Sequence, residues 1–325
     1  MSKPSLANRV RQGDRAALAK AITLVESTRP DHRAQATALL DELTPDSGGA
    51  LRVGISGTPG VGKSTFIEAF GLHLVNQQQL RVAVLAVDPS STRHGGSILG
   101  DKTRMANLAR HESAFIRPTP SGGTLGGVAR RTREVLLLCE AARYDVVLVE
   151  TVGVGQSETA VARMTDVFIL LVAPGGGDEL QGVKRGIMEL ADLVVVNKCD
   201  GNLEQAARMT LGDYSSALRL VRPRSTAWLP MAMPASALTG LGVAEVWDRL
   251  IDVRQALEGA GEFALRRAEQ SRSWMWDELS ERVLSELRSH PGVAGLLATL
   301  ERQVMAGARS PGSAVDLLMQ AWSAS

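Results

Sequence analysis

Gly57-Thr58-Pro59-Gly60-Val61-Gly62-Lys63-Ser64 matches the pattern G-x-x-x-x-G-K-[ST], which is typical of a phosphate-binding loop. Its glycines allow the backbone to curl so that successive N–H groups point inward at anionic oxygens. The Lys63 ammonium can then reach the β- and γ-phosphates of a nucleotide, and the Ser64 hydroxyl can bind Mg²⁺. We therefore predict that these residues, together with Thr65, contact a nucleotide.

The flanking sequence has the strand–loop–helix order that such a loop requires. Residues 51–56 predict a short strand, and residues 64–74 predict a helix with apolar side chains near one face. The N-terminus of that helix adds a favourable dipole for phosphate. A chance glycine-rich turn is the alternative, and the agreement of motif and context argues against it. Strands and helices alternate from residue 51 onward, which predicts an α/β P-loop NTPase fold with a mostly parallel sheet flanked by helices.

Two apolar strands of this sheet are predicted to end in an acidic residue. Residues 80–87 lead into Asp88, and the strand predicted over residues 144–150 has Glu150 as its last residue. Ligands of open parallel sheets bind outside the carboxyl ends of the strands. Both carboxylates are therefore candidates for holding Mg²⁺ or the attacking water, although Asp88 could instead cap the turn that follows it.

The loops after these strands contain further candidates. Asp101 lies in a segment rich in glycine and charge, which is typical of a loop that γ-phosphate orders. Gly153 can offer its N–H to the γ-phosphate. Val154 follows it, where Ras-type GTPases have a water-orienting Gln, so we expect slow intrinsic hydrolysis that a partner stimulates. The predicted catalytic residues are Lys63, Asp88, Asp101 and Glu150, and the predicted Mg²⁺ ligands, direct or through water, are Ser64, Asp88, Asp101 and Glu150.

The sequence Asn197-Lys198-Cys199-Asp200 follows an apolar run and has the pattern N-K-x-D. The Asp200 carboxylate can accept from guanine N1–H and the exocyclic amine, and adenine offers neither donor there. An unsatisfied buried acceptor is costly, so such a site rejects adenine. Asn197 can brace the P-loop, and the Lys198 stem can lie along the base. Ser236-Ala237-Leu238 matches a second element, which places backbone N–H groups at guanine O6.

Composition restricts the class of protein. The chain has 325 residues and a formal net charge of +1, so no bulk attraction to nucleic acid or an anionic membrane is expected. Its longest apolar runs suit buried strands and are too short to cross a bilayer. The first residues do not resemble a signal peptide. The two cysteines are far apart in sequence, which argues against a disulfide scaffold and for a reducing compartment. We therefore expect a soluble, cytoplasmic protein.

The chain is predicted to have three parts. Residues 1–47 form a helical extension in which Asp14 caps a helix, residues 48–260 form the nucleotide-binding domain, and residues 261–325 form a helical arm broken at Pro291-Gly292. Residues 116–123 are expected to be a flexible stretch. Three of the five tryptophans fall in the arm, which is too small to bury them unaided, so we expect it to dock on its own domain or on a second subunit.

The order of these elements closely resembles one family. The P-loop, the two acidic strand ends, N-K-C-D and S-A-L resemble, in this order, the P-loop GTPases associated with methylmalonyl-CoA mutase, the MeaB/ArgK group. The resemblance extends to the longer segments V-D-P-S-S, G-G-S-I-L-G-D-K-T-R-M and E-T-V-G-V-G-Q-S-E. The match runs from about Leu51 to Leu257. The resemblance implies a GTPase chaperone that binds the adenosylcobalamin-dependent mutase, gates cofactor loading and protects the mutase from inactivation. It also implies a homodimer formed through the C-terminal arm and an additional switch at residues 173–184.

Three other functions are compatible with parts of the sequence. A metal-insertion GTPase of the nickel-enzyme type should show clustered Cys or His ligands, whereas the five histidines here are scattered and no C-x-x-C occurs. A P-loop kinase acting on a transport protein is the second alternative, but N-K-x-D would be unusual in a kinase that uses ATP. A scaffold that binds GTP without turnover is the third alternative. The cobalamin-binding pattern D-x-H-x-x-G is absent from the sequence, so we expect no histidine-ligated cobalamin.

Overall fold

The computed structural model describes residues 4–27, 29–87, 105–118, 125–151, 157–175 and 185–323. The chain divides into two compact units, residues 1–270 and residues 271–325. None of the helices in the described residues combines the length and the apolar character needed to cross a lipid bilayer.

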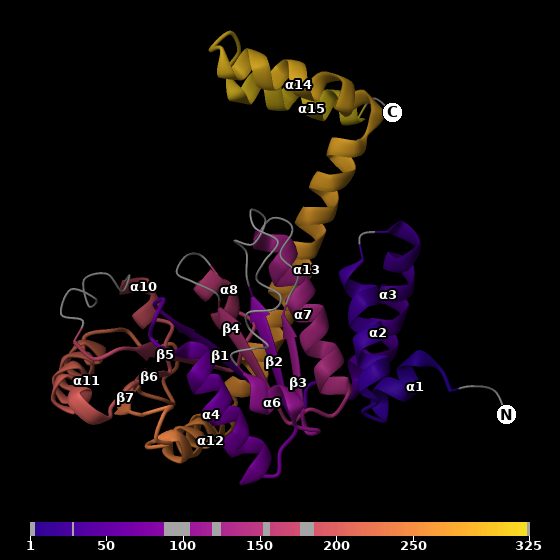
Figure 1. Cartoon of the computed structure of the whole chain (residues 1–325). Coiled ribbons are helices and arrows are strands. Elements are labelled where there is room, and N and C mark those ends of the chain that lie inside the picture. The colour runs from indigo at the N-terminus through magenta and orange to yellow at the C-terminus, as the bar shows by residue number, and fades with distance from the viewer. Residues whose placement is uncertain are drawn as a thin grey trace. The chain divides into compact units, whose positions relative to one another are not determined.

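The first unit is built on a parallel sheet, as the sequence predicts. Within the described residues, seven strands are hydrogen-bonded in the order β3-β2-β4-β1-β5-β6-β7 (Figure 1). Every pair of neighbours in this sheet is parallel. The long buried apolar runs of the central strands fit a sheet that is covered on both faces. The strands are β1 (Leu51–Gly57), β2 (Val82–Val87), β3 (Ala114–Pro118), β4 (Val146–Thr151), β5 (Val167–Val172), β6 (Leu193–Val196) and β7 (Met231–Pro234).

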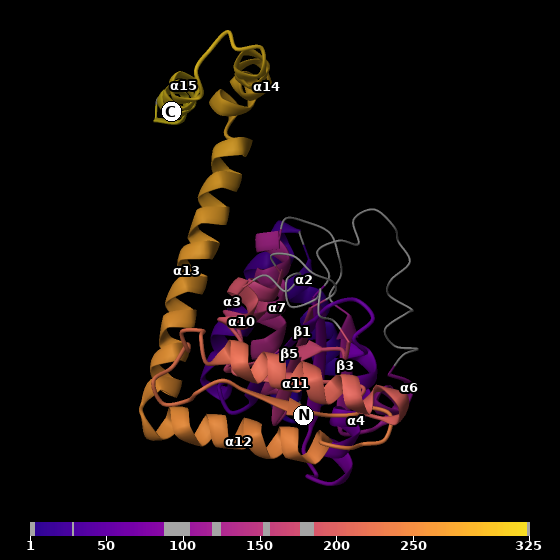
Figure 2. The same ribbon diagram turned by 90° about the vertical axis from the view of Figure 1, so that its left-hand side faces the viewer.

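Helices cover both faces of the sheet because successive side chains of a strand point to opposite faces. Ile55 of β1 lies in the apolar core with residues of α4 and α12, whereas a side chain at Gly54 would meet Val161 of α8. The helix α7 also contacts β2, β4 and α8. The helix α11 contacts β6 and β7, α12 contacts β5 and α4, and Figure 2 shows α12 below α11. These helices are α4 (Lys63–Asn76), α7 (Leu125–Ala141), α8 (Ser157–Ala162), α11 (Glu204–Leu218) and α12 (Val243–Gly259). Shorter helical segments are α6 (Ala106–Arg110), α10 (Arg185–Met188), η1 (Thr44–Asp46) and η2 (Gly201–Leu203).

The N-terminal extension is helical, with α1 (Leu6–Arg11), α2 (Arg15–Glu26) and α3 (Pro30–Leu43) packed beside α7 (Figure 1). Asp14 caps α2 as predicted, because its carboxylate accepts hydrogen bonds from the backbone N–H groups of Ala16 and Ala17. This cap satisfies two of the unpaired donors at the start of the helix.

The expectation of a flexible stretch at residues 116–123 is wrong for its first residues. Residues 114–118 form the edge strand β3, which pairs in parallel with β2. Its apolar run is short and ends in Pro118, so it resembles a loop in sequence. A proline is tolerated in an edge strand, where the backbone need not donate to a further neighbour. Residues 119–124 lie outside the described part of the chain.

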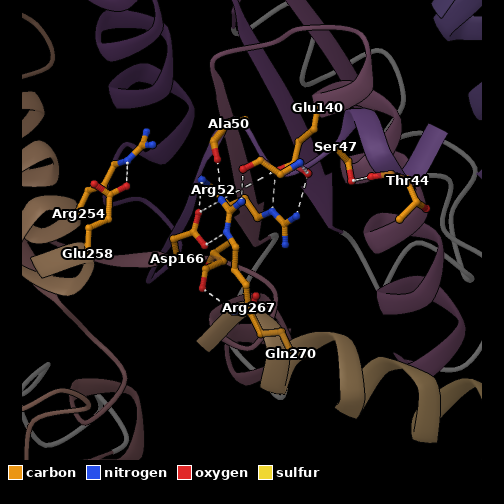
Figure 3. Close-up of polar contacts among 12 residues, drawn as sticks. Thr44, Ser47, Ala50, Arg52, Glu140, Asp166, Arg254, Glu258, Arg267 and Gln270 are labelled. Carbon is orange, nitrogen blue, oxygen red and sulfur yellow. Dashed lines mark hydrogen bonds and ion pairs between the residues drawn. The ribbon is translucent and has the colours of Figure 1, made fainter. Parts of the chain in front are cut away.

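A buried ion-pair network crosses the amino ends of β1 and β5 (Figure 3). Arg52 of β1 donates two hydrogen bonds of 2.8 Å to Glu140 of α7. Asp166 accepts from the Arg52 backbone N–H at 2.8 Å and from Arg267 at 2.8 and 2.6 Å. Arg267 and Gln270 belong to the first turns of α13 (Glu262–Ser289), so this network fastens the start of α13 to the sheet.

The second unit contains the rest of α13, followed by α14 (Pro291–Met305) and α15 (Pro311–Ser323). The predicted break at Pro291-Gly292 is confirmed, because α13 ends at Ser289 and Pro291 begins α14. The helices α14 and α15 pack against each other.

Candidate nucleotide site

The P-loop joins the end of β1 to the start of α4. Gly62 caps α4 with φ of 90°, in the left-handed region that favours glycine. At Gly57 an added Cβ would lie 2.4 Å from the Leu171 carbonyl oxygen, so only glycine allows this close approach between β1 and β5. The turn therefore requires glycines at both ends of the loop, and it directs the N-terminus of α4 toward the carboxyl edge of the sheet.

Lys63 lies within this loop. Its Nζ donates hydrogen bonds to the Gly57 carbonyl at 2.7 Å and the Thr58 carbonyl at 3.4 Å. Burial lowers the pKa of the Lys63 ammonium below its ordinary value, and the nearby carboxylates of Glu150 and Glu158 raise it in part. A partly desolvated ammonium interacts more strongly with an anion than an ammonium in water does. Lys63 is thus suited to hold a phosphate.

Ser64 and Glu150 come together from different elements. The Ser64 Oγ, at the start of α4, lies 3.5 Å from Glu150 Oε1 near the end of β4. The Glu150 side chain is buried, with 4% of the residue exposed. A hydroxyl and a carboxylate are oxygen donors of the kind that Mg²⁺ prefers, so this pair fits a Mg²⁺ ion beside the P-loop.

Asn197 connects two loops of the site. Its Nδ2 donates to the Val61 carbonyl of the P-loop at 2.9 Å, and its Oδ1 accepts from the Ala237 N–H at 3.1 Å. The residue is only 1% exposed. Lys198 adopts φ of 63° and its Nζ donates to the Gly60 carbonyl at 2.6 Å. The N-K-x-D segment therefore braces the phosphate loop.

Asp200 and Ser236 bring the two predicted guanine elements together. Ser236 Oγ donates to Asp200 Oδ1 at 2.5 Å, and it accepts from the Thr239 N–H at 3.2 Å. This contact fixes the orientation of the Asp200 carboxylate. Leu238, in the same turn, is 81% exposed. Cys199 lies between Lys198 and Asp200, where burial raises the pKa of its thiol and its Sγ donates a hydrogen bond to the Val196 carbonyl.

Most of the predicted site is described, and it gathers at one edge of the sheet. The P-loop follows β1, Glu150 lies near the end of β4, Asn197 follows β6, and Ser236 comes soon after β7. Asp88, Asp101 and Gly153 lie outside the described residues, so their assignments remain predictions. Within the described part of the chain, no three His, Cys, Asp or Glu side chains form a metal-binding cluster.

Two features of this edge were not assigned from the sequence. Thr151 Oγ1 donates to Ser56 Oγ at 2.9 Å, and both residues are buried. Glu158 of α8 is also buried, and its carboxylate lies close enough to Lys63 to raise the pKa of the Lys63 ammonium. The only sequence signal is position, because Ser56 precedes the P-loop and Thr151 follows Glu150.

A family model described as "Methylmalonyl Co-A mutase-associated GTPase MeaB" matches residues 18–292. A probable GTPase of Mycobacterium bovis is 57% identical, with 97% of this chain and 94% of that protein covered. The GTPase ArgK of Escherichia coli is 55% identical, with 86% of this chain and 84% of that protein covered.

Two further likenesses extend the comparison. A mouse protein named methylmalonic aciduria type A homolog, mitochondrial, is 50% identical, with 96% of this chain and 77% of that protein covered. A crystal structure titled LAO/AO transport system kinase is 43% identical, with a TM-score of 0.77 and coverage of 97% of this chain and 95% of that one.

Proposed function

We propose that this chain is a chaperone of an adenosylcobalamin-dependent methylmalonyl-CoA mutase, because it belongs to the MeaB family of methylmalonyl-CoA mutase-associated GTPases. The chain is a P-loop GTPase. In this role it gates cofactor loading and protects the mutase from inactivation. A related acyl-CoA mutase would fit the role of client equally well. The nucleotide is GTP, which is hydrolysed to GDP and phosphate.

The observation that carries the nucleotide assignment is the arrangement around Asp200. Ser236 orients the Asp200 carboxylate, and Asn197 holds the Ala237 turn beside it. A fixed carboxylate accepts from guanine N1–H and the exocyclic amine, and it would be left unsatisfied by adenine. The Lys198 stem lies along the base, and the N–H groups of residues 236–238 serve guanine O6. Asn197 itself links base recognition to the P-loop.

The phosphates are held by the P-loop backbone, from Gly57 to Thr65, at the N-terminus of α4. Lys63 exchanges its two carbonyl partners for phosphate oxygens, since charged acceptors make stronger hydrogen bonds with an ammonium. Ser64 and Glu150 hold Mg²⁺, with Asp88 and Asp101 completing the set directly or through water. The ion neutralises charge on the β- and γ-phosphates when it is bound. The Gly153 N–H meets the γ-phosphate.

The partners proposed are the mutase and a second copy of this chain. The described part of α13 carries exposed apolar side chains at i, i+3 and i+7, namely Trp276, Leu279 and Val283. We call these three residues the arm face. Monomeric proteins seldom leave such a stripe exposed, which supports a homodimer formed through the arm. Neither nucleic acid nor a membrane is proposed as a partner, and the proposed location is the cytoplasm.

The test is GTP hydrolysis by the purified protein, with and without the mutase, and with ATP as the control nucleotide. We expect slow turnover of GTP alone, because no Gln follows Gly153, and a sharp rise in turnover when the mutase is present. Turnover of GTP that ignores the mutase would redirect the search to another client. Equal use of ATP, or phosphate trapped on a protein acceptor, would contradict the proposal and favour a kinase.

A further inference from the structure

The residues that flank the two phosphate-side motifs touch each other. Ser56 is the last residue before the P-loop motif, and Thr151 is the residue after Glu150. Thr151 Oγ1 donates to Ser56 Oγ at 2.9 Å, with 0% and 1% of the two residues exposed. Buried hydroxyls are normally hydrogen-bonded, and this pair satisfies that need by joining two strands.

The contact lies where β1 and β4 separate. The paired positions of these two strands end at Ile55 and Glu150. One residue further, Ser56 is paired with β5, and Thr151 is paired with β2. The side-chain hydrogen bond thus continues the connection between β1 and β4 beyond their last paired position. It lies at the level where the chain leaves the sheet to form the nucleotide site.

The two hydroxyls act from the face of the sheet opposite Ser64. Ile55 packs in the core with α4, whereas Gly54 faces α8, so Ser56 also points to the α8 face. Thr151 contacts Ser56 on that face, and Glu150 reaches Ser64 on the other. Within the residues that the structure describes, Ser56 and Thr151 lie on the far face, so we assign their influence on a ligand to the backbone of Gly57 and Glu150.

We infer that Ser56 and Thr151 are positioning residues that fix the distance between the P-loop and Glu150 and thereby set the affinity for Mg²⁺. The inference rests on the proposed function, which assigns Ser64 and Glu150 to the metal. Residues that orient metal ligands typically change metal affinity by about 10- to 100-fold when their contact is lost. A hydroxyl pair on the α8 face thus controls a metal on the α4 face.

The test measures release of a fluorescent GDP analogue from the full-length protein over a range of Mg²⁺ concentrations. Thr151→Val removes the hydroxyl while keeping the side-chain shape, Thr151→Ser restores it, and Ser56→Ala removes the acceptor. Thr165→Val is the matched control, because Thr165 is equally buried but lies before the start of β5. Its hydroxyl donates a hydrogen bond to the Val161 carbonyl and does not join β1 to β4. Urea unfolding of each variant reports its stability separately.

We expect Thr151→Val and Ser56→Ala to raise the Mg²⁺ concentration needed to slow release by about tenfold, while release in EDTA stays within twofold of the wild type. Thr151→Ser and Thr165→Val should keep the wild-type Mg²⁺ dependence. If both hydroxyl-deleting variants lose stability but keep that dependence, the pair is only structural and the inference is wrong. A wild type whose release ignores Mg²⁺ would instead contradict the metal assignment of the proposed function. If Thr151→Val does not fold, Ser56→Ala decides the question.

Discussion

In the proposed site, base recognition depends on a single carboxylate. Asp200 is held by Ser236, and the proposed site uses it to accept two hydrogen bonds from guanine. Hydrogen bonds to a charged group contribute about 1.5–3 kcal/mol each. Asp200→Asn should therefore weaken GTP binding by about 100-fold or more. It should bind xanthosine triphosphate better than GTP, because xanthine carries a carbonyl where guanine carries its amine. Competition against a fluorescent GDP analogue measures both affinities.

Ser236→Ala provides the control for this prediction. It removes the group that orients Asp200 but leaves the carboxylate charge, so GTP binding should weaken without any gain for the xanthine nucleotide. If Asp200→Asn keeps its preference for GTP, Asp200 does not read the base.

At the scale of residues, the sequence predicts the motif side chains but not their supports. Lys63, Asn197 and Asp200 are recognisable because their spacing within a motif is fixed. Ser56 and Thr151 are 95 positions apart in the sequence, and nothing in either local sequence indicates the other. Their contact exists because β1 and β4 are neighbours in the sheet, which is a property of the topology.

At the scale of elements, the network at the amino ends of the strands makes a separate prediction. Arg52 and Glu140 are nearly fully buried, so losing the Glu140 charge leaves a buried guanidinium that is poorly compensated. Glu140→Gln should lower the free energy of unfolding by about 3 kcal/mol. Urea unfolding measures this change, and GTP hydrolysis should persist because the network lies at the edge opposite the nucleotide site.

The matched control is Glu258→Gln, which breaks the i,i+4 pair between Arg254 and Glu258 in α12 (Figure 3). Both partners are substantially exposed, so the loss should be about 0.5 kcal/mol or less. Equal losses in the two variants would show that burial of the Arg52–Glu140 pair does not strengthen it.

The parallel sheet is predictable because several of its strands are continuous apolar runs, such as β2 (Val82–Val87) and β5 (Val167–Val172). The edge strand β3 is not, because its apolar run is short and ends in proline. The network is also hidden in the sequence, since charged residues are usually exposed and Arg52 is the one charged residue of β1. Only the packing of α7 and α13 against the amino ends of β1 and β5 makes burial of these charges possible.

At the scale of the whole molecule, the arm face makes a prediction about assembly. We expect the wild-type protein to have twice the mass of one chain in light scattering during size-exclusion chromatography. Trp276→Glu places a charge in the arm face, where Trp276 is 58% exposed, and should yield the mass of a single chain. Leu229→Glu alters another highly exposed apolar residue outside the arm and should leave the mass unchanged. A wild-type monomer would contradict the proposed dimer.

Proline also closes the two outer strands of the sheet. The edge strand β3 ends at Pro118, and the opposite edge strand β7 ends at Pro234. Open sheet edges are templates on which a second chain can add a strand, and proline interrupts that template because it has no N–H to donate. We therefore expect the sheet to resist edge-to-edge aggregation during synthesis and refolding. The proposed homodimer would therefore form through helices and not through the edges of the sheet.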